Sequence, residues 1–413
     1  MSKYIYSFLV FALSSSLLAC NAYKVRKGYQ KGKAQPQQFY ETVSFETYNN
    51  WMVLEVRLND HEEPFRFLYD TGAPNVVTPQ TVEKLGLKSF AKRNVGDSQG
   101  RSSKLEFVNL DAVHIGNVTF EQTSAVVTAL DAVPELECPG FDGFIGANLM
   151  KLAKWEIDYE AKKMIFTNDR SKLSALEDGF KIPFTTSQQY SPYTKVTLLD
   201  SVEQRFKIDT GKDGDIDIRS AAFHSKLDSF FTFPHYTIFG RSGAGIYGAT
   251  QDTFHVVYLD SIRLGDLTIH DQAFLVEKRT PNLLGMGILK NYHLLLDWDK
   301  KEAILEPFQP DSNQNEVKKE SFGFQLSLKN QQLEVVSLVR NSPAEVAGIK
   351  IGDQIIQIDQ TAYQQLRLQD YCDFGTVRDL ERDSISLKVK RADQIFERKL
   401  YKEDVVQQPK LKQ

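Results

Sequence analysis

The chain contains two copies of one long unit, and this duplication constrains the fold more than any other feature of the sequence. The tripeptide Asp-Thr-Gly occurs at Asp70–Gly72 and again at Asp209–Gly211, 139 residues later (209 − 70). Two further pairs of segments recur at the same offset: Phe144–Gly146 with Leu283–Gly285, and Trp155–Asp158 with Leu294–Asp297. Because three pairs share one spacing, the pattern indicates an internal repeat. We therefore expect two similar lobes, each contributing one Asp-Thr-Gly copy.

Short alternating or β-branched runs make up most of residues 39–310, for example Met52–Leu58 and Phe65–Tyr69. Such runs predict strands, and few long amphipathic patterns interrupt them. One short helix is expected where Thr78 and Pro79 form a cap and first turn and Gly86 ends the helix. The predicted fold class is therefore mostly β.

The first residues predict export. Lys3 gives a short positive start, residues 4–18 are largely apolar, and Leu-Leu-Ala-Cys closes the segment at Cys20. This ending resembles the lipobox of bacterial lipoproteins. The resemblance implies that residues 1–19 are a signal peptide and that Cys20 is lipidated, the alternative being an ordinary signal peptide with a chance cysteine. We expect a protein of the cell envelope, lipid-anchored in the outer membrane and facing the periplasm or the surface.

Charge and cysteine content narrow the class further. Residues 20–38 carry lysine and arginine without one acidic residue, which predicts a basic flexible tether, either solvated or lying against anionic head groups. The whole chain is nearly balanced, with 50 Lys+Arg against 54 Asp+Glu, so no basic footprint of a nucleic-acid binder is present. Cys138 and Cys372 fall in different predicted domains, so a structural disulfide is not expected.

The two recurring aspartates indicate that the repeat forms a catalytic site. Two carboxyl groups held a hydrogen-bond length apart share one proton, because like charges that close cannot both ionise. One carboxylate then takes a proton from a water while the other donates one to the scissile carbonyl oxygen, which hydrolyses a peptide bond without a covalent intermediate. Asp70 and Asp209 are therefore the candidate catalytic pair.

On these residues the chain resembles the aspartic proteases. Phe67–Ala73 and Phe206–Gly211, each followed later by an apolar-apolar-Gly segment, match the motif of that family, and the form with Ala73 is most similar to a retropepsin-like lobe. The resemblance implies a bilobal acid-protease β fold, with lobe 1 over residues 39–175 and lobe 2 over residues 176–310. It also implies a role for each motif residue: Asp70 and Asp209 as the catalytic dyad, Thr71 and Thr210 as interlocking hydroxyls, and Gly72 and Gly211 as the turn.

Glycine-rich segments follow each motif and predict hairpin tips that can close over a groove. They are residues 96–101 and residues 240–248, and the same pattern is also typical of turns that merely connect strands. The flap residues expected from the resemblance are Gly96, Gly100, Gly243 and Tyr247.

Lys212 departs from the family, which carries a small residue after Asp-Thr-Gly. An ammonium near the dyad would favour the doubly ionised form and weaken the acid half of the mechanism, whereas a solvent-facing Lys212 would change nothing. Asp213, Asp215 and Asp217 follow it, but they lack the glycine position and the distant glutamate of a calcium loop. We expect no metal and no cofactor.

The last unit, residues 318–403, resembles a PDZ domain. Phe322-Gly323-Phe324 fits its apolar-Gly-apolar loop, and 342–353 fits the segment that follows. The resemblance implies that the loop offers backbone N–H groups to the terminal carboxylate of a peptide while a strand edge accepts the peptide; the alternative is a docking module with an occluded groove. Residues 404–413 are expected to be a disordered tail.

Together these features predict an aspartic endopeptidase with a C-terminal PDZ domain. Its partners would be peptide or protein substrates, a possible C-terminal peptide at the PDZ domain and, through the lipid anchor, a membrane. The alternative is a catalytically inactive peptide-binding envelope lipoprotein of the same fold, which Lys212 keeps open.

Overall fold

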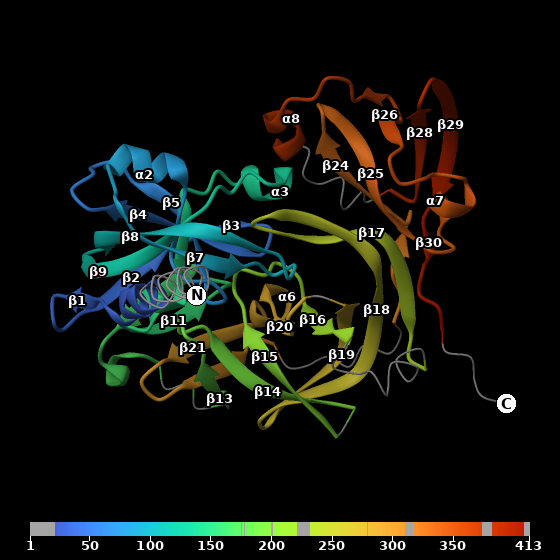
Figure 1. Cartoon of the computed structure of the whole chain (residues 1–413). Helices are drawn as coiled ribbons and strands as arrows, with labels where there is room; N and C mark the ends of the chain where they lie inside the picture. The colour runs from blue at the N-terminus through green and yellow to red at the C-terminus, as the bar shows by residue number, and fades with distance from the viewer. Residues whose placement is uncertain are drawn as a thin grey trace, which may run out of the picture.

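The computed structural model describes residues 21–174, 176, 178–199, 201–220, 232–278, 280–309, 317–373 and 382–408. Two β lobes lie side by side and a smaller β unit follows them, as Figure 1 shows. The expected signal peptide and Cys20 lie outside the described residues. In the part of the chain that is described, no helix combines the length and the apolarity needed to cross a membrane.

Lobe 1 is built on one sheet in the strand order β1-β9-β6-β10-β5-β4-β8-β7, with β3 beside β4. Its core strand pair is β5 and β10, which run parallel so that Gly146 lies opposite Asp70. Thr78 caps helix α2, Pro79 begins it and Gly86 ends it in the left-handed conformation, as predicted. The bounds are β1 Lys33–Gln35, β3 Glu46–Tyr48, β4 Trp51–Leu58, β5 Phe65–Asp70, β6 Val76–Val77, α2 Pro79–Leu85, β7 Ser89–Gly96, β8 Ser102–Ile115, β9 Val118–Val127, α3 Pro134–Glu137, β10 Gly143–Gly146 and α4 Ala147–Met150.

Lobe 2 repeats this arrangement. Strands β15 and β20 are parallel, with Ile208 opposite Leu284, and β16 and β19 are parallel as β6 and β9 are in lobe 1. The long hairpin of β17 and β18 corresponds to β7 and β8. The bounds are β14 Pro192–Leu198, β15 Val202–Ile208, β16 Ile216–Arg219, β17 His235–Gly245, β18 Gly248–Leu264, β19 Leu267–Glu277, β20 Leu283–Leu284 and α6 Met286–Leu289.

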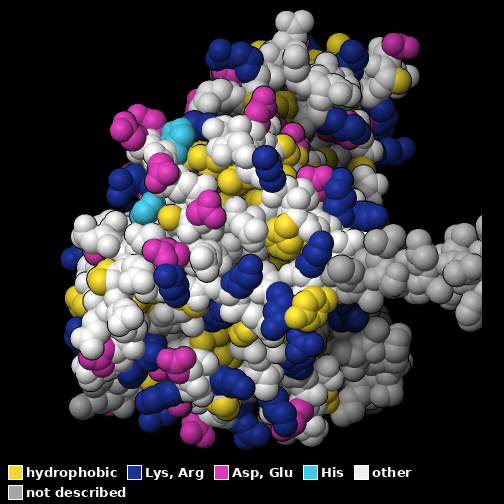
Figure 2. Space-filling model, turned by 60° about the vertical axis from the view of Figure 1, so that its left-hand side comes forward, with side chains coloured by type: hydrophobic (Ala, Val, Ile, Leu, Met, Phe, Trp, Pro, Cys, Tyr) yellow, Lys and Arg dark blue, Asp and Glu magenta, His cyan; other side chains and the backbone are white. Residues whose placement is uncertain are grey.

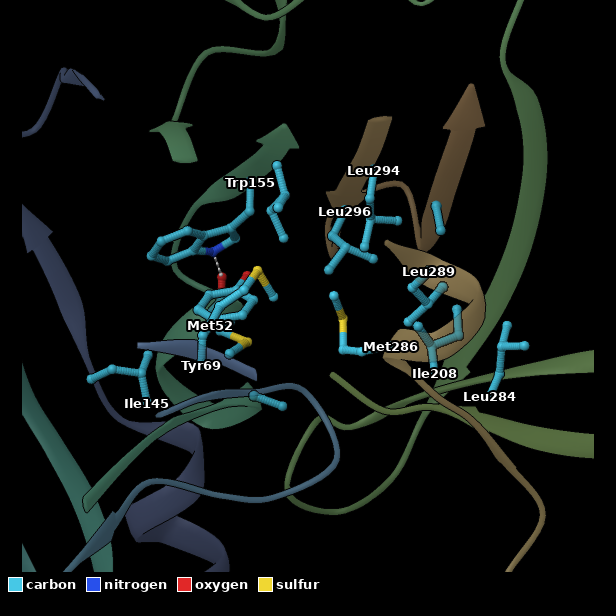
Figure 3. Packing of buried hydrophobic residues seen from close by; sticks show 14 of the residues in the cluster. Met52, Tyr69, Ile145, Trp155, Ile208, Leu284, Met286, Leu289, Leu294 and Leu296 are labelled. Carbon is cyan, nitrogen blue, oxygen red and sulfur yellow. Dashed lines mark hydrogen bonds between the residues drawn. The ribbon is translucent and has the colours of Figure 1, made fainter. Parts of the chain in front are cut away.

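Strands from both halves of the repeat join the lobes beneath the site. The matched segments β11 and β21 pair with each other, Trp155 opposite Leu296, and β12, β2, β22 and β13 extend the ladder on both sides. Apolar side chains of both lobes meet over this sheet, and Figure 3 shows Trp155 and Tyr69 on one side and Leu294, Leu296 and Met286 on the other. The bounds are β2 Tyr40–Ser44, β11 Lys154–Asp158, β12 Lys163–Thr167, β13 Phe180–Thr186, β21 Tyr292–Asp297 and β22 Glu302–Pro307, with a 3-10 turn at Arg170–Lys172.

The third unit is attached to lobe 2 by backbone pairing. Strand β25 pairs with β24 and β26 inside the unit and also with β17, where Phe239 lies opposite Leu338. The unit has its own apolar core around Leu333, Val335 and Val389. The bounds are β23 Glu320–Ser321, β24 Phe324–Lys329, β25 Gln332–Val339, α7 Pro343–Val346, β26 Gln354–Ile358, β27 Thr361–Ala362, α8 Leu368–Asp373, β28 Ser384–Arg391, β29 Gln394–Tyr401 and β30 Glu403–Asp404.

The basic segment before lobe 1 is not a flexible tether. Residues 21–30 are helical, and the side chains of Val25 and Tyr29, one helical turn apart, are buried against lobe 1, where Tyr29 contacts the ring of Phe107. Strand β1 then pairs with β9. The prediction of a flexible tether was wrong because it rested on the basic residues alone. Val25 and Tyr29 form a short apolar stripe on the helix, and this stripe packs against lobe 1.

The tail beyond residue 403 also differs from the prediction. Strand β30 pairs with β23, Val405 and Val406 are buried, and Gln407 forms a β-bridge with His235 of lobe 2. The tail is therefore ordered up to residue 408, because Val405 packs with apolar side chains of β17 and β18. Residues 409–413 lie outside the described part.

The surface mixes charges of both signs. Figure 2 shows lysine and arginine interspersed with aspartate and glutamate over the face it displays. This face carries no single-sign stripe of the kind that a nucleic-acid groove would need.

Candidate active site

Asp70 and Asp209 end equivalent strands of the two lobes. Asp70 is the last residue of β5, and Asp209 follows β15 directly, with its N–H donating to the carbonyl oxygen of Leu284 at 2.9 Å. Both side chains are buried, Asp70 at 8% and Asp209 at 7% exposure. In each lobe, the strand that pairs in parallel with the motif strand comes from the apolar-apolar-Gly segment of the repeat. The two recurring segments of each copy therefore lie side by side at the site.

The two threonines lock the motifs together. The N–H of Thr71 donates to Oγ1 of Thr210, and the N–H of Thr210 donates to Oγ1 of Thr71, each at 3.0 Å. Each hydroxyl in turn donates to a backbone carbonyl of the other lobe, Thr71 to Ile208 at 2.7 Å and Thr210 to Tyr69 at 2.8 Å. This reciprocal set fixes the motifs in one relative position.

The two glycines leave room for the carboxyl groups. A Cβ atom on Gly72 would lie 2.2 Å from Asp209 Oδ2, and one on Gly211 would lie 2.3 Å from Asp70 Cγ. Each aspartate thus lies against the glycine of the opposite motif, and any side chain there would overlap it. The structure therefore brings the Asp70 and Asp209 side chains together at the lobe interface.

Burial and mutual repulsion set the protonation of this pair. The pKa of Asp70 is raised to about 7, first by burial and then by the charge of Asp209. The ammonium of Lys207 and the N–H groups of Gly72 and Ala73 oppose this rise in the pKa of Asp70. One proton on the pair near neutrality is what hydrolysis by two carboxyl groups requires.

Each lobe also holds the motif loop of the other. From lobe 1, Trp51 Nε1 donates to the carbonyl of Gly211 at 2.8 Å and Asn50 donates to the carbonyl of Asp213 at 2.6 Å. From lobe 2, Gln189, which stands 139 residues after Asn50 (189 − 50), donates to the carbonyl of Gly72 at 3.3 Å, and Ser191 Oγ donates to the same carbonyl at 3.1 Å.

Lys212 is neither at the dyad nor in solvent. Its Nζ lies 2.8 Å from Asp217 Oδ1; the side chain of Asp217 is buried and that of Lys212 is 16% exposed. The Asp213–Asp217 segment is thereby tied to an ammonium. In the described ranges, no group of three or more His, Cys, Asp or Glu is arranged to hold a metal ion.

The lysine that does lie beside the dyad was missed by sequence reasoning. Lys207 Nζ is 3.7 Å from Asp209 Oδ2 and donates to the carbonyl oxygen of Gly72 at 3.1 Å. Its place two residues before Asp209 on a strand was the available signal, because alternate residues share a face.

The expected flap tips meet each other. Tyr247, in the turn of β17 and β18, donates its hydroxyl to the carbonyl of Val95 at 2.8 Å, and its N–H donates to Asp97. Thr250 donates to the side chain of Gln99 at 2.6 Å. Gly96 and Gly100 flank the lobe 1 tip, and Gly243 lies on the irregular stretch of β17 just before Tyr247. The tips of the two flap hairpins are therefore in direct contact, one from each lobe.

A cavity of about 920 Å³ joins the protease lobes to the third unit. Its walls include the motif loop at Lys212–Asp217, the stretch Ser242–Ala244 of the lobe 2 flap strand and Trp51. On the other side it is lined by Phe322, Phe324 and residues of α8. Of the loop predicted to bind a carboxylate, Phe322 and Phe324 thus face a space shared with the protease lobes, while Gly323 adopts a positive φ of 85° that suits glycine.

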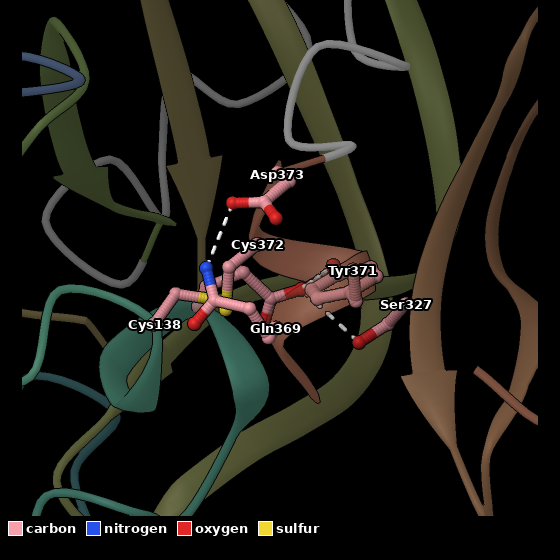
Figure 4. The surroundings of a disulfide bond; sticks show 7 residues. Cys138, Ser327, Gln369, Tyr371, Cys372 and Asp373 are labelled. Carbon is pink, nitrogen blue, oxygen red and sulfur yellow. Dashed lines mark hydrogen bonds between the residues drawn. A yellow bond between two sulfur atoms is a disulfide. The ribbon is translucent and has the colours of Figure 1, made fainter. Parts of the chain in front are cut away.

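A disulfide fixes the third unit beside this cavity, contrary to the sequence-based expectation. Cys138, at the end of α3, bonds to Cys372 of α8, and their Cα atoms are 5.3 Å apart (Figure 4). The expectation was wrong because domain docking brings together two cysteines that are 234 residues apart in the chain.

The carboxylate of Glu135 reinforces the same contact. It accepts hydrogen bonds from Arg241 of β17 at 2.6 Å, Ser327 of β24 at 3.0 Å and Tyr371 of α8 at 2.7 Å. Glu135 thus reaches from lobe 1 between β24 and α8, so one end of the space between these two elements is filled by the protein itself.

The fold and the paired motifs define a mostly β chain with an aspartyl protease domain followed by a PDZ domain, and the resemblances to aspartic proteases and to PDZ domains are confirmed. The family model described as aspartyl protease matches residues 54–149, within lobe 1, and the model described as PDZ domain matches residues 312–374.

Individual proteins show more distant similarity. A "Putative zinc metalloprotease" of Borreliella burgdorferi is 38% identical over 68 residues, which are 16% of this chain and 15% of that protein. The crystal structure of basic 7S globulin from soybean aligns with a TM-score of 0.38 and 10% identity, over 65% of this chain and 94% of the globulin.

Proposed function

We propose that the protein is an aspartic endopeptidase that cuts extended polypeptides with a water activated between Asp70 and Asp209. The observation that carries this proposal is the placement of two buried carboxyl groups, each against the glycine of the opposite motif, with the pKa of Asp70 raised to about 7. In the reaction, the water oxygen bonds to the carbonyl carbon while one proton passes to the carboxylate and the other carboxyl group protonates the carbonyl oxygen. The C–N bond then breaks as a proton moves to the leaving nitrogen.

The PDZ domain would contribute to substrate binding in this proposal. Phe322 and Phe324 line the same cavity as Lys212–Asp217, which follow the second motif, and Ser242–Ala244 of the lobe 2 flap strand, so a segment held there would also contact the protease lobes. Glu135 accepts hydrogen bonds from Ser327 of β24 and Tyr371 of α8 and so occupies one end of the space between these two elements. A peptide would therefore bind in the remainder of the cavity.

A protein lacking residues 1–20 tests the proposal. It should cut an unfolded polypeptide, and Asp70→Asn and Asp209→Asn should each reduce kcat/KM by at least about a thousandfold, since either change removes the proton-sharing pair. Asp111→Asn, at an exposed position of β8, is the matched control and should cut normally. Equal rates for all four proteins would refute the proposal, and binding of peptide without cutting would favour the inactive binding protein.

We further propose that the protein is exported and lipid-anchored through Cys20 in the bacterial envelope. The Cys138–Cys372 bond supports this location, because structural disulfides persist in oxidising compartments. Expression of the full chain with Cys20→Ala should move the protein from the membrane fraction to the soluble fraction. An unchanged membrane fraction and no incorporation of labelled fatty acid into the wild type would contradict the anchor.

A further inference from the structure

Lys207 breaks the symmetry of the paired motifs. The residue at the equivalent position of the first copy is Leu68 (207 − 139), an apolar side chain with 2% exposure. In lobe 2 the same position carries an ammonium whose Nζ lies 3.7 Å from Asp209 Oδ2. A positive charge therefore stands beside one of the two carboxyl groups and has no counterpart at the matching position beside the other.

This ammonium is fixed in place rather than free to move. Its side chain is only 15% exposed, and it donates to the carbonyl oxygen of Gly72 at 3.1 Å. Gln189 and Ser191 donate to the same carbonyl, so three donors converge on the turn that follows Asp70. A buried lysine is retained at such a site only where charged or polar groups compensate its lost hydration.

The groups that face Lys207 identify its partner. Asp209 directly follows β15, the strand that carries Lys207, and Asp70 approaches from β5. Tyr193 is the register partner of Lys207 on β14, with the guanidinium of Arg205 stacked 4.0 Å over the Tyr193 ring. On the other side, the neighbour on β20 is the apolar Leu283. Asp209 is therefore the acidic group that Lys207 meets most closely. Burial lowers the pKa of Lys207, but the charges of Asp209 and Asp70 outweigh burial and raise this pKa overall, so the ammonium persists over the working pH range.

We propose that Lys207 is a positioning residue that keeps Asp209 as the ionised member of the dyad and leaves the shared proton on Asp70. This inference rests on the proposed peptidase function. It assigns the two halves of the reaction: Asp209 accepts the proton from water, and Asp70 donates its proton to the scissile carbonyl oxygen. In a symmetric dyad the roles of proton acceptor and proton donor would be interchangeable. Here the two roles differ, because the first copy has Leu68 at the position where the second copy has Lys207.

The kinetic test compares Lys207→Met with Lys207→Arg. Removing the ammonium takes away a positive charge that favours ionisation of both carboxyl groups, so both limbs of the pH profile of kcat/KM should move to higher pH by about one unit. Lys207→Arg keeps the charge and should retain the wild-type limbs. Lys195→Met, at an exposed lysine of β14, is the control and should change nothing. A Lys207→Met protein with a lower rate but unmoved limbs would overturn the proposal, because Lys207 would then be merely structural.

A titration that needs no turnover separates this inference from the proposed function. In protein labelled with ¹³C at the aspartate carboxyl carbons, Asp70→Asn and Asp209→Asn identify the two signals. The signal of Asp70 should titrate near pH 7 in the wild type and at higher pH in Lys207→Met. A proton found on Asp209 instead would overturn the assignment. If the wild type cuts nothing, the peptidase proposal fails while this titration still tests Lys207.

Discussion

Thr71 and Thr210 exchange hydrogen bonds across the lobe interface, each backbone N–H donating to the hydroxyl oxygen of the other residue at 3.0 Å. The two side chains are fully buried. Since each hydroxyl also donates to a carbonyl of the opposite lobe, four hydrogen bonds related by the internal repeat hold the two aspartates at one spacing. The geometry of the dyad thus depends on residues that take no part in proton transfer.

Replacing one of these threonines should weaken the lobe interface. Thr210→Val keeps the volume but leaves the N–H of Thr71 and the carbonyl of Tyr69 without these partners, at a cost of about 1–3 kcal/mol for each buried group. Urea unfolding followed by tryptophan fluorescence measures the loss. Thr42→Val, exposed on β2, is the control and should change the unfolding free energy by less than about 0.5 kcal/mol. Equal stabilities of the two variants would contradict this account.

Peptide cutting should decline as the pH rises through about 7. The pKa of Asp70 is raised to about 7 by burial and by the charge of Asp209, so above that pH the pair loses its shared proton and with it the acid for the carbonyl oxygen. Initial rates on an unfolded polypeptide between pH 4 and pH 9 measure this limb. A rate that stays constant up to pH 9 would show that the proton on Asp70 is not needed.

The same carboxyl group should make stability depend on pH. Because its pKa is raised in the folded state above the ordinary aspartate value of 3.8, the folded protein binds this proton more tightly than the unfolded chain. The stability that the proton contributes is present below about pH 4 and is lost as the pH rises toward 7. Asp70→Asn should therefore gain stability relative to the wild type between pH 4 and pH 8. Chemical unfolding at both pH values checks the sign, and a constant difference would refute it.

The repeat offset of 139 predicted two equivalent lobes with one Asp-Thr-Gly copy each, whereas the interlocking of Thr71 with Thr210 and the roles of the two aspartates were implied by the resemblance to aspartic proteases. It could not predict the contact of Cys138 with Cys372, because that contact depends on how β25 docks against β17 and not on any local pattern. The helix over residues 21–30 was obscured because the three basic residues Lys24, Arg26 and Lys27 outnumber an apolar stripe that consists only of Val25 and Tyr29. Lys207 could have been recognised by aligning it with Leu68.

Lys212 should matter for stability rather than for the pH profile. Its ammonium pairs with the buried carboxylate of Asp217 at 2.8 Å. Burial raises the pKa of Asp217, and the charge of Lys212 opposes that rise. Lys212→Ala leaves Asp217 buried without this partner and should cost about 3–5 kcal/mol. The control is Lys195→Ala, which breaks the exposed pair with Glu203 and should cost less than about 1 kcal/mol. A Lys212→Ala protein of normal stability but shifted pH profile would instead place the ammonium in the chemistry.

Release of the PDZ domain should require two changes at the contact with lobe 1. The disulfide Cys138–Cys372 and the buried pair of Glu135 with Arg241 hold the same interface, so Cys138→Ser alone leaves the hydrogen bonds and Glu135→Ala alone leaves the covalent bond. Breaking a buried ion pair costs about 3–5 kcal/mol, and loss of the disulfide removes the constraint that would otherwise keep the two surfaces together. The double variant should therefore show faster hydrogen exchange in β24 and α8 and a larger radius of gyration than either single variant. Adding a reductant to Glu135→Ala should reproduce both effects, whereas a double variant as compact and as protected as the wild type would show that the ladder between β17 and β25 is sufficient by itself.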